Sequence, residues 1–64
     1  MHTIMTTETG SIEFYPHEGE NSATIIIYRD GYSDVEINIK TDEWVLELGY
    51  LDEDNPQETI GLPN

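Results

Sequence analysis

The sequence contains no cysteine, and only one lysine and one arginine stand among its 64 residues. Without cysteine, the chain has neither a disulfide framework nor a thiolate metal site to support a small core. No apolar run approaches the roughly 20 residues that a membrane-spanning helix needs, and the N-terminus lacks the basic and apolar regions of a signal peptide. These absences predict a soluble protein of the cytoplasm.

The length of the chain limits its organisation. A chain of 64 residues is about half of a typical domain, so it has room for one hydrophobic core. We predict a single small β domain over residues 1–51 and an acidic, flexible C-terminal tail over residues 52–64. Ile60 and Leu62 leave open an alternative in which part of this tail docks on a sheet edge.

Charge is the most unusual property of the sequence. Fourteen Asp and Glu residues stand against Arg29 and Lys40, which gives a formal net charge of -12. This exceeds the net charge of about 2 to 8 that keeps a small domain soluble. It repels nucleic acid and anionic membranes, so we expect binding to neither, and its natural complement is a basic surface. Eight isoleucines separate the chain from disordered acidic tails and predict that it folds.

The apolar residues recur mostly with a period of two, which is typical of half-buried strands. Residues 12–14 (Ile-Glu-Phe) and 35–39 (Val-Glu-Ile-Asn-Ile) show this alternation clearly. We therefore predict an all-β fold, a small antiparallel meander of four to five strands. Alternation and aromatic content favour a strand within residues 42–51 as well, although one short helix there is the alternative. The expected core consists of Ile25, Val35, Ile37, Trp44, Leu46 and Leu48.

A turn at Arg29-Asp30-Gly31 divides two of the expected strands. A two-residue Asp-Gly loop would place Ile25 opposite Glu36, which mixes the apolar and polar faces. A three-residue loop with Gly31 in the left-handed position of a bulge instead places Ile25 opposite Val35. We predict this second register, which also sets Ala23 opposite Ile37.

The acidic residues provide the candidate binding site. Residues two apart on a strand lie on one face about 6.7 Å apart, so Asp34 and Glu36 are expected to form a row of exposed, unpaired carboxylates. A solvated surface group is the simpler interpretation of any single carboxylate, but the ensemble favours recognition. The candidate partner-binding residues are Glu13, Asp30, Asp34, Glu36, Glu47, Asp52, Glu53, Asp54, Tyr28 and Tyr32.

Metal and catalytic motifs are weak in this sequence. Residues 52–58 are rich in oxygen ligands but lack the glycine at the sixth position and the glutamate at the twelfth that an EF-hand loop needs. His2 and His17 are too few for a transition-metal site. The chain has no nucleophile elbow, phosphate loop or zinc-protease motif. We predict no metal, no cofactor, no catalytic residue and no enzymatic activity.

Together these features predict an acidic inhibitor that occupies the basic nucleic-acid-binding surface of another protein. In size and composition the chain is similar to inhibitors from bacteriophages and other mobile elements, such as anti-CRISPR and anti-restriction proteins. That resemblance implies a DNA mimic acting in the host cytoplasm. Two alternatives remain: a structural or assembly module, including a homodimer that pairs exposed strand edges, and a salt-adapted acidic domain of unknown role.

Overall fold

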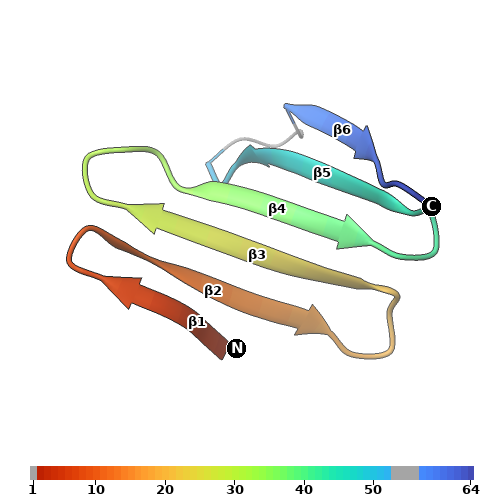
Figure 1. The fold of residues 1–64 in the computed structure, drawn as a ribbon, viewed down its shortest axis with the longest axis horizontal. Helices are drawn as coiled ribbons and strands as arrows, with labels where there is room; N and C mark the ends of the chain where they lie inside the picture. The colour runs from red at the N-terminus through yellow and green to blue at the C-terminus, as the bar shows by residue number, and fades with distance from the viewer. Residues whose placement is uncertain (1, 53–56) are drawn as a thin grey trace.

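The computed structural model describes residues 2–52 and 57–64, which form one antiparallel sheet (Figure 1). Neighbouring strands in the sheet follow one another along the chain, so the topology is a simple meander. The strands are β1 (His2–Thr7), β2 (Gly10–His17), β3 (Ser22–Arg29), β4 (Val35–Lys40), β5 (Val45–Tyr50) and β6 (Glu58–Gly61). The prediction of an all-β antiparallel meander is confirmed, with six strands in place of four to five.

Two segments that the sequence left ambiguous belong to this sheet. Within residues 42–51 the chain forms β5 and not a helix. Residues Glu58–Gly61 form β6, which pairs with β5 and brings Ile60 opposite Leu46. The edge docking considered for Ile60 is therefore present, and this part of the acidic C-terminal segment is a strand.

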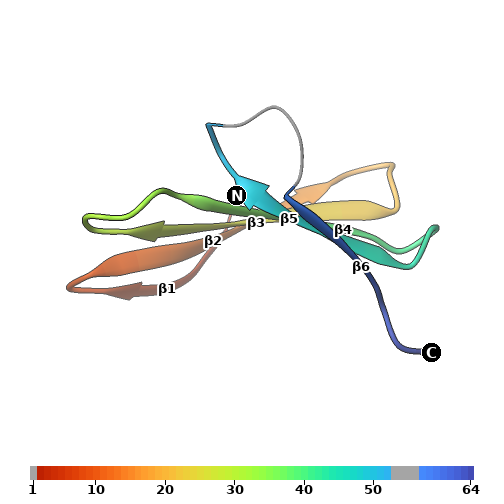
Figure 2. The same ribbon diagram turned by 90° about the horizontal axis from the view of Figure 1, so that it is seen from above.

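The sheet is a single twisted layer. Viewed from above, the described strands lie in one layer with no second layer packed against them (Figure 2). Period-two alternation places aliphatic side chains on one side, which we call the apolar face, and mostly polar side chains on the other, the polar face. Cross-strand partners form three rows on the apolar face: Ile12, Ile27, Val35 and Tyr50; Phe14, Ile25, Ile37 and Leu48; and Pro16, Ala23, Ile39, Leu46 and Ile60.

The predicted core residues share this face but are only half-buried. Ile25, Val35, Ile37, Leu46 and Leu48 all point to it, and none is fully buried. Among the described residues no hydrophobic side chain reaches full burial. A single layer has nothing to place on top of its apolar face, so the sheet lacks the closed core that a two-layer domain has.

The register predicted between β3 and β4 is wrong by two residues. Ile25 lies opposite Ile37, and Ala23 lies opposite Ile39. The reason is the turn: Ile27 and Val35 are the last residues that pair across it, so residues 28–34 separate the paired ends, and residues 30–34 lie outside the strands, where the prediction had a three-residue loop. The Tyr32 amide donates to the Arg29 carbonyl over 3.2 Å, which closes the turn before β4 begins. A shift of two residues preserves the faces, and Gly31 is left-handed as expected, with φ of 78°.

Trp44 was predicted to lie in the core, and this prediction is also wrong. It precedes β5, has a left-handed backbone with φ of 57°, and is 43% exposed. Its indole Nε1 donates to the Pro63 carbonyl oxygen over 2.7 Å, and its own carbonyl accepts from the Leu62 amide over 2.9 Å. The prediction assumed that Trp44 continues the alternation of side chains along β5. Its left-handed backbone, at the end of the turn between β4 and β5, interrupts that alternation. Trp44 holds the C-terminal segment instead.

Two residues allow β2 to lie between its neighbours. A Cβ atom at Gly10 would collide with the Tyr28 carbonyl oxygen, so only glycine permits this close approach to β3. Pro16, which has no amide hydrogen, lies beyond the last residue that pairs with β1, which is Phe14. None of the described residues pairs with that side of β2 at Pro16, and proline is tolerated at such a position.

Candidate functional site

The acidic residues surround the apolar face but do not occupy its centre. Twelve of the fourteen carboxylates lie in the described residues. Glu58, on β6 opposite Leu48, and the basic Arg29 lie at the margins of the apolar face. The other eleven acids fall into three sets: Glu8, Asp30, Asp34 and Asp52 in the loops at one end of the sheet; Glu18, Glu20, Asp42 and Glu43 in the loops at the other end; and Glu13, Glu36 and Glu47 on the polar face.

Both strongly basic side chains are already engaged within the chain. Lys40 Nζ lies 3.2 Å from Glu47 Oε1 and 3.8 Å from Glu43 Oε2. The hydrogen bond to Glu47, followed by the charges of Glu47 and Glu43, raises the pKa of Lys40 above its usual value. The Arg29 guanidinium carbon lies 4.4 Å from the centroid of the Tyr32 ring. Because Lys40 and Arg29 are held by these contacts, neither neutralises the remaining carboxylates, whose negative field is free to act on a partner.

Several of the predicted residues gather at one end of the sheet. Tyr32, Asp34 and Asp52 line a hollow of about 310 Å³ together with Ser33 and Leu51, and we call this hollow the Tyr32 pocket. The Leu51 amide donates to the Asp34 carbonyl oxygen over 3.1 Å, which joins the two loops that form it. Tyr32 is 67% exposed. Because Arg29 already lies over the Tyr32 ring, the two carboxylates are the groups that suit an arginine or lysine side chain of a partner.

Asp30 lies in the same loop as Tyr32 but does not line the pocket. The remaining described candidates, Glu13, Tyr28, Glu36 and Glu47, lie within strands and on the polar face. The predicted residues are thus divided between the loops at one end of the sheet and the polar face. Glu53 and Asp54 lie outside the described residues.

The expected row of unpaired carboxylates at Asp34 and Glu36 is not found. Asp34 lies in the loop before β4, whereas Glu36 lies within β4. Glu36 is half-buried, and its Oε1 accepts from Asn38 Nδ2 over 2.8 Å. The prediction failed because it placed Asp34 within the strand and overlooked Asn38, which is the polar partner of Glu36 two residues further along β4.

Glu13 is also engaged on the polar face. The Tyr15 hydroxyl donates to Glu13 Oε2 over 2.7 Å. This hydrogen bond is the main reason why the pKa of Tyr15 lies above its usual value, and a hydrogen bond with Tyr28 adds to the effect. With Glu47 bound to Lys40, all three carboxylates of the polar face have a partner in the chain.

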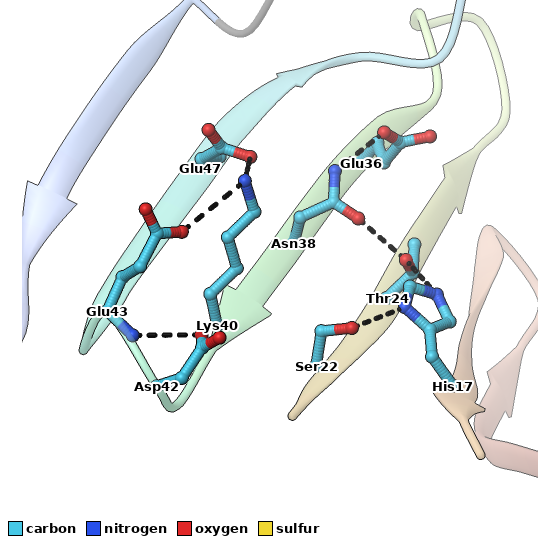
Figure 3. A network of polar contacts seen from close by, with 9 residues as sticks. All are labelled: His17, Ser22, Thr24, Glu36, Asn38, Lys40, Asp42, Glu43 and Glu47. Atoms are coloured by element: carbon cyan, nitrogen blue, oxygen red, sulfur yellow. Dashed lines mark hydrogen bonds and ion pairs between the residues drawn. The ribbon is translucent and has the colours of Figure 1, made fainter. Parts of the chain in front are cut away.

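A chain of hydrogen bonds across β2, β3 and β4 was missed by the sequence analysis (Figure 3). Thr24 donates its single hydroxyl proton to Asn38 Oδ1 over 2.6 Å, so at 2.9 Å its oxygen must accept from His17 Nε2. His17 Nδ1 lies 2.8 Å from Ser22 Oγ, and Asn38 Nδ2 donates to Glu36 Oε1, which extends the network to Glu36. The spacing of His17, Ser22 and Thr24 around a short polar loop is the signal that could have revealed it.

This network orients the histidine ring and satisfies the most buried polar group. Thr24 is 9% exposed and is the most buried residue among those that the structure describes. Its position between His17 and Asn38 joins three strands through side chains. We interpret the network as a structural element that fixes the polar face.

Residues 2–52 and 57–64 contain no group of three or more His, Asp or Glu side chains arranged to hold a metal ion. The same residues include no helix that is long and apolar enough to cross a membrane. Comparison of the chain with protein-family models, curated proteins and solved structures finds no match.

Proposed function

We propose that this protein binds a basic nucleic-acid-binding protein and competes with nucleic acid for its surface. The observation that supports this most directly is the Tyr32 pocket, where Asp34 and Asp52 lie beside an exposed aromatic ring. Carboxylates form charge-assisted hydrogen bonds with arginine and lysine much as phosphates do. The pocket therefore has the chemistry to receive a basic side chain that otherwise contacts a phosphate.

The overall charge density supports the same proposal. The molecule measures 35 Å along its longest axis and carries a net charge of -12, which is one charge per about 3 Å. Duplex DNA carries one charge per about 1.7 Å of its axis, so the two densities agree within a factor of two. Such a field steers a basic partner and accelerates association at low salt.

The specific form of the proposal is an inhibitor of the anti-CRISPR or anti-restriction type, carried by a phage and acting in the host cytoplasm. Acidic groups at the loop end bring the partner in, and the tyrosine and Leu51 in the pocket add apolar contacts that charge alone does not supply. The inhibitor excludes nucleic acid by occupying the same surface and needs no catalytic step.

The test starts from affinity capture in host lysate at low and high salt, followed by competition. The captured protein is loaded with a labelled duplex, and release of the duplex is measured as the inhibitor is added. Asp34→Asn with Asp52→Asn should weaken binding by about 1 to 3 kcal/mol, since two charge-assisted contacts are lost.

The matched control, Glu18→Gln with Glu20→Gln, removes the same charge from the opposite end of the sheet and should have the smaller effect. Equal losses from both pairs would indicate a nonspecific acidic surface without a defined site. Recovery of no basic protein at either salt concentration would count against the proposal as a whole.

A further inference from the structure

The apolar face has no cover among the described residues, and this is the largest feature that the proposed function does not use. Three rows of mainly aliphatic side chains cross β2 to β5, and no hydrophobic residue in the described part is fully buried. Stable domains bury such a face against a second layer. Exposed apolar patches above a few hundred Å² are uncommon on monomers and mark interaction surfaces.

We propose that this face packs against the same face of a second copy of the chain and forms a two-layered β-sandwich homodimer. The proposal is independent of the inhibitor function, because it rests on the face opposite to Glu13, Glu36 and Glu47 and not on the acidic residues.

The size of the face suits a stable dimer. The five strands that carry these rows, β2 to β6, lie about 4.8 Å apart and are mostly six to eight residues long, so at about 3.3 Å per residue they cover roughly 500 Å² in projection. The ridged surface of the side chains has a larger accessible area, close to the ~800 Å² per partner of a standard interface. Two sheets packed face to face about 10 Å apart are the usual geometry of a sandwich.

The distribution of charge identifies a second copy as the occupant. The centre of the face, at Ile25 and Ile37, has only apolar neighbours across the strands, so self-contact buries no like charges there. A basic protein finds no carboxylate to bind in this centre. A two-fold axis places the patch against itself, and its centre is complementary to itself because it is apolar.

The acidic loops give the dimer a distinctive dependence on salt. Each copy carries a net charge of -12, so the two copies repel each other at long range. Added salt screens this repulsion and leaves the apolar contact intact, and the dimer should tighten as salt rises. Binding of a basic partner has the opposite dependence, which separates a failure of this proposal from a failure of the proposed function.

The experiment measures the mass of the full chain by analytical ultracentrifugation over a concentration series in 0.05 and 0.5 M NaCl. We expect a species of twice the 7.3 kDa chain mass, more populated at the higher salt. Ile37→Asn, at the centre of the apolar face, should weaken the dimer about 100-fold, because symmetry places the change twice in the interface. Ile26→Asn, on the polar face of β3 opposite Glu36, is the matched control and should leave the dimer unchanged.

A second measurement does not depend on any variant being folded. In a mixture of isotope-labelled and unlabelled wild-type chains, filtered NMR spectra should show intermolecular contacts between isoleucine methyl groups of the apolar face. A monomer at every concentration and both salts would overturn the proposal. So would a dimer that weakens with salt, or one that keeps its affinity in Ile37→Asn, or one whose intermolecular contacts join only the backbones of the edge strands β1 and β6.

Discussion

Replacement of Thr24 by valine tests whether the hydrogen-bond network on the polar face stabilises the fold. The side chains have nearly the same shape, but valine can neither donate to Asn38 nor accept from His17. Each lost hydrogen bond costs about 1 kcal/mol net, which gives about 2 kcal/mol for the pair. Water can reach the half-buried His17 and Asn38, and valine favours strands slightly, so the expected loss is about 1 to 2 kcal/mol.

Thermal unfolding followed by circular dichroism is the assay. For 64 residues the unfolding entropy is about 0.13 kcal/mol/K, so each kcal/mol lowers the melting temperature by about 7 °C. All variants are compared at one protein concentration, because association shifts the melting temperature. Thr24→Ser keeps the hydroxyl group and should lose less than half as much. If Thr24→Val melts at or above the wild type while Thr24→Ser melts below it, the methyl group matters and the network does not.

Two further predictions concern high pH and the C-terminal segment. The pKa values of Tyr15 and Lys40 are both raised in the folded chain, so the folded state holds these protons more tightly than the unfolded state. The free energy of unfolding should therefore fall as the pH rises from about 10, near the unfolded pKa values, through the folded pKa values. Urea unfolding at pH 9 and pH 11 measures this change, and equal stability at the two pH values would contradict the prediction. Trp44→Phe removes the donor to the Pro63 carbonyl and should cost about 0.5 to 1 kcal/mol at this exposed site. The Leu62 amide should then exchange its hydrogen faster, and unchanged protection would show that the indole does not hold the segment.

The alternation of apolar residues was enough to predict the strands and their faces. Val35, Ile37 and Ile39 lie on one face, and the residues between them lie on the other, because a strand side chain has only two directions. The exact pairing depends on the length of the turn, and a loop of five residues has no strong sequence signature. The register was therefore predicted with the right faces but with a shift of two residues.

The candidate site was harder to predict because it depends on contacts between strands. Tyr32, Asp34 and Asp52 were among the predicted residues, and the structure brings them together in one pocket. Glu36 has its partner Asn38 on the same strand, but nothing in a single strand shows that His17, Thr24 and Asn38 are linked across β2, β3 and β4. The left-handed backbone of Trp44 was equally hidden, since that conformation is uncommon for any residue with a Cβ atom.

The meander order of the strands has a consequence for how the molecule folds and opens. Each strand packs only on its neighbours in the sequence, so the sheet behaves as a row of hairpins joined side by side. In such a row the stability of each strand depends on its contacts with its neighbours, as in repeat proteins, so the strands at the two ends open first. The outer strands are the weakest members: β6 has four residues, and β1 is exposed along its whole length with an irregular step between Thr3 and Met5. The eight-residue strands β2 and β3 form the natural starting point for folding, from which the sheet grows outward in both directions.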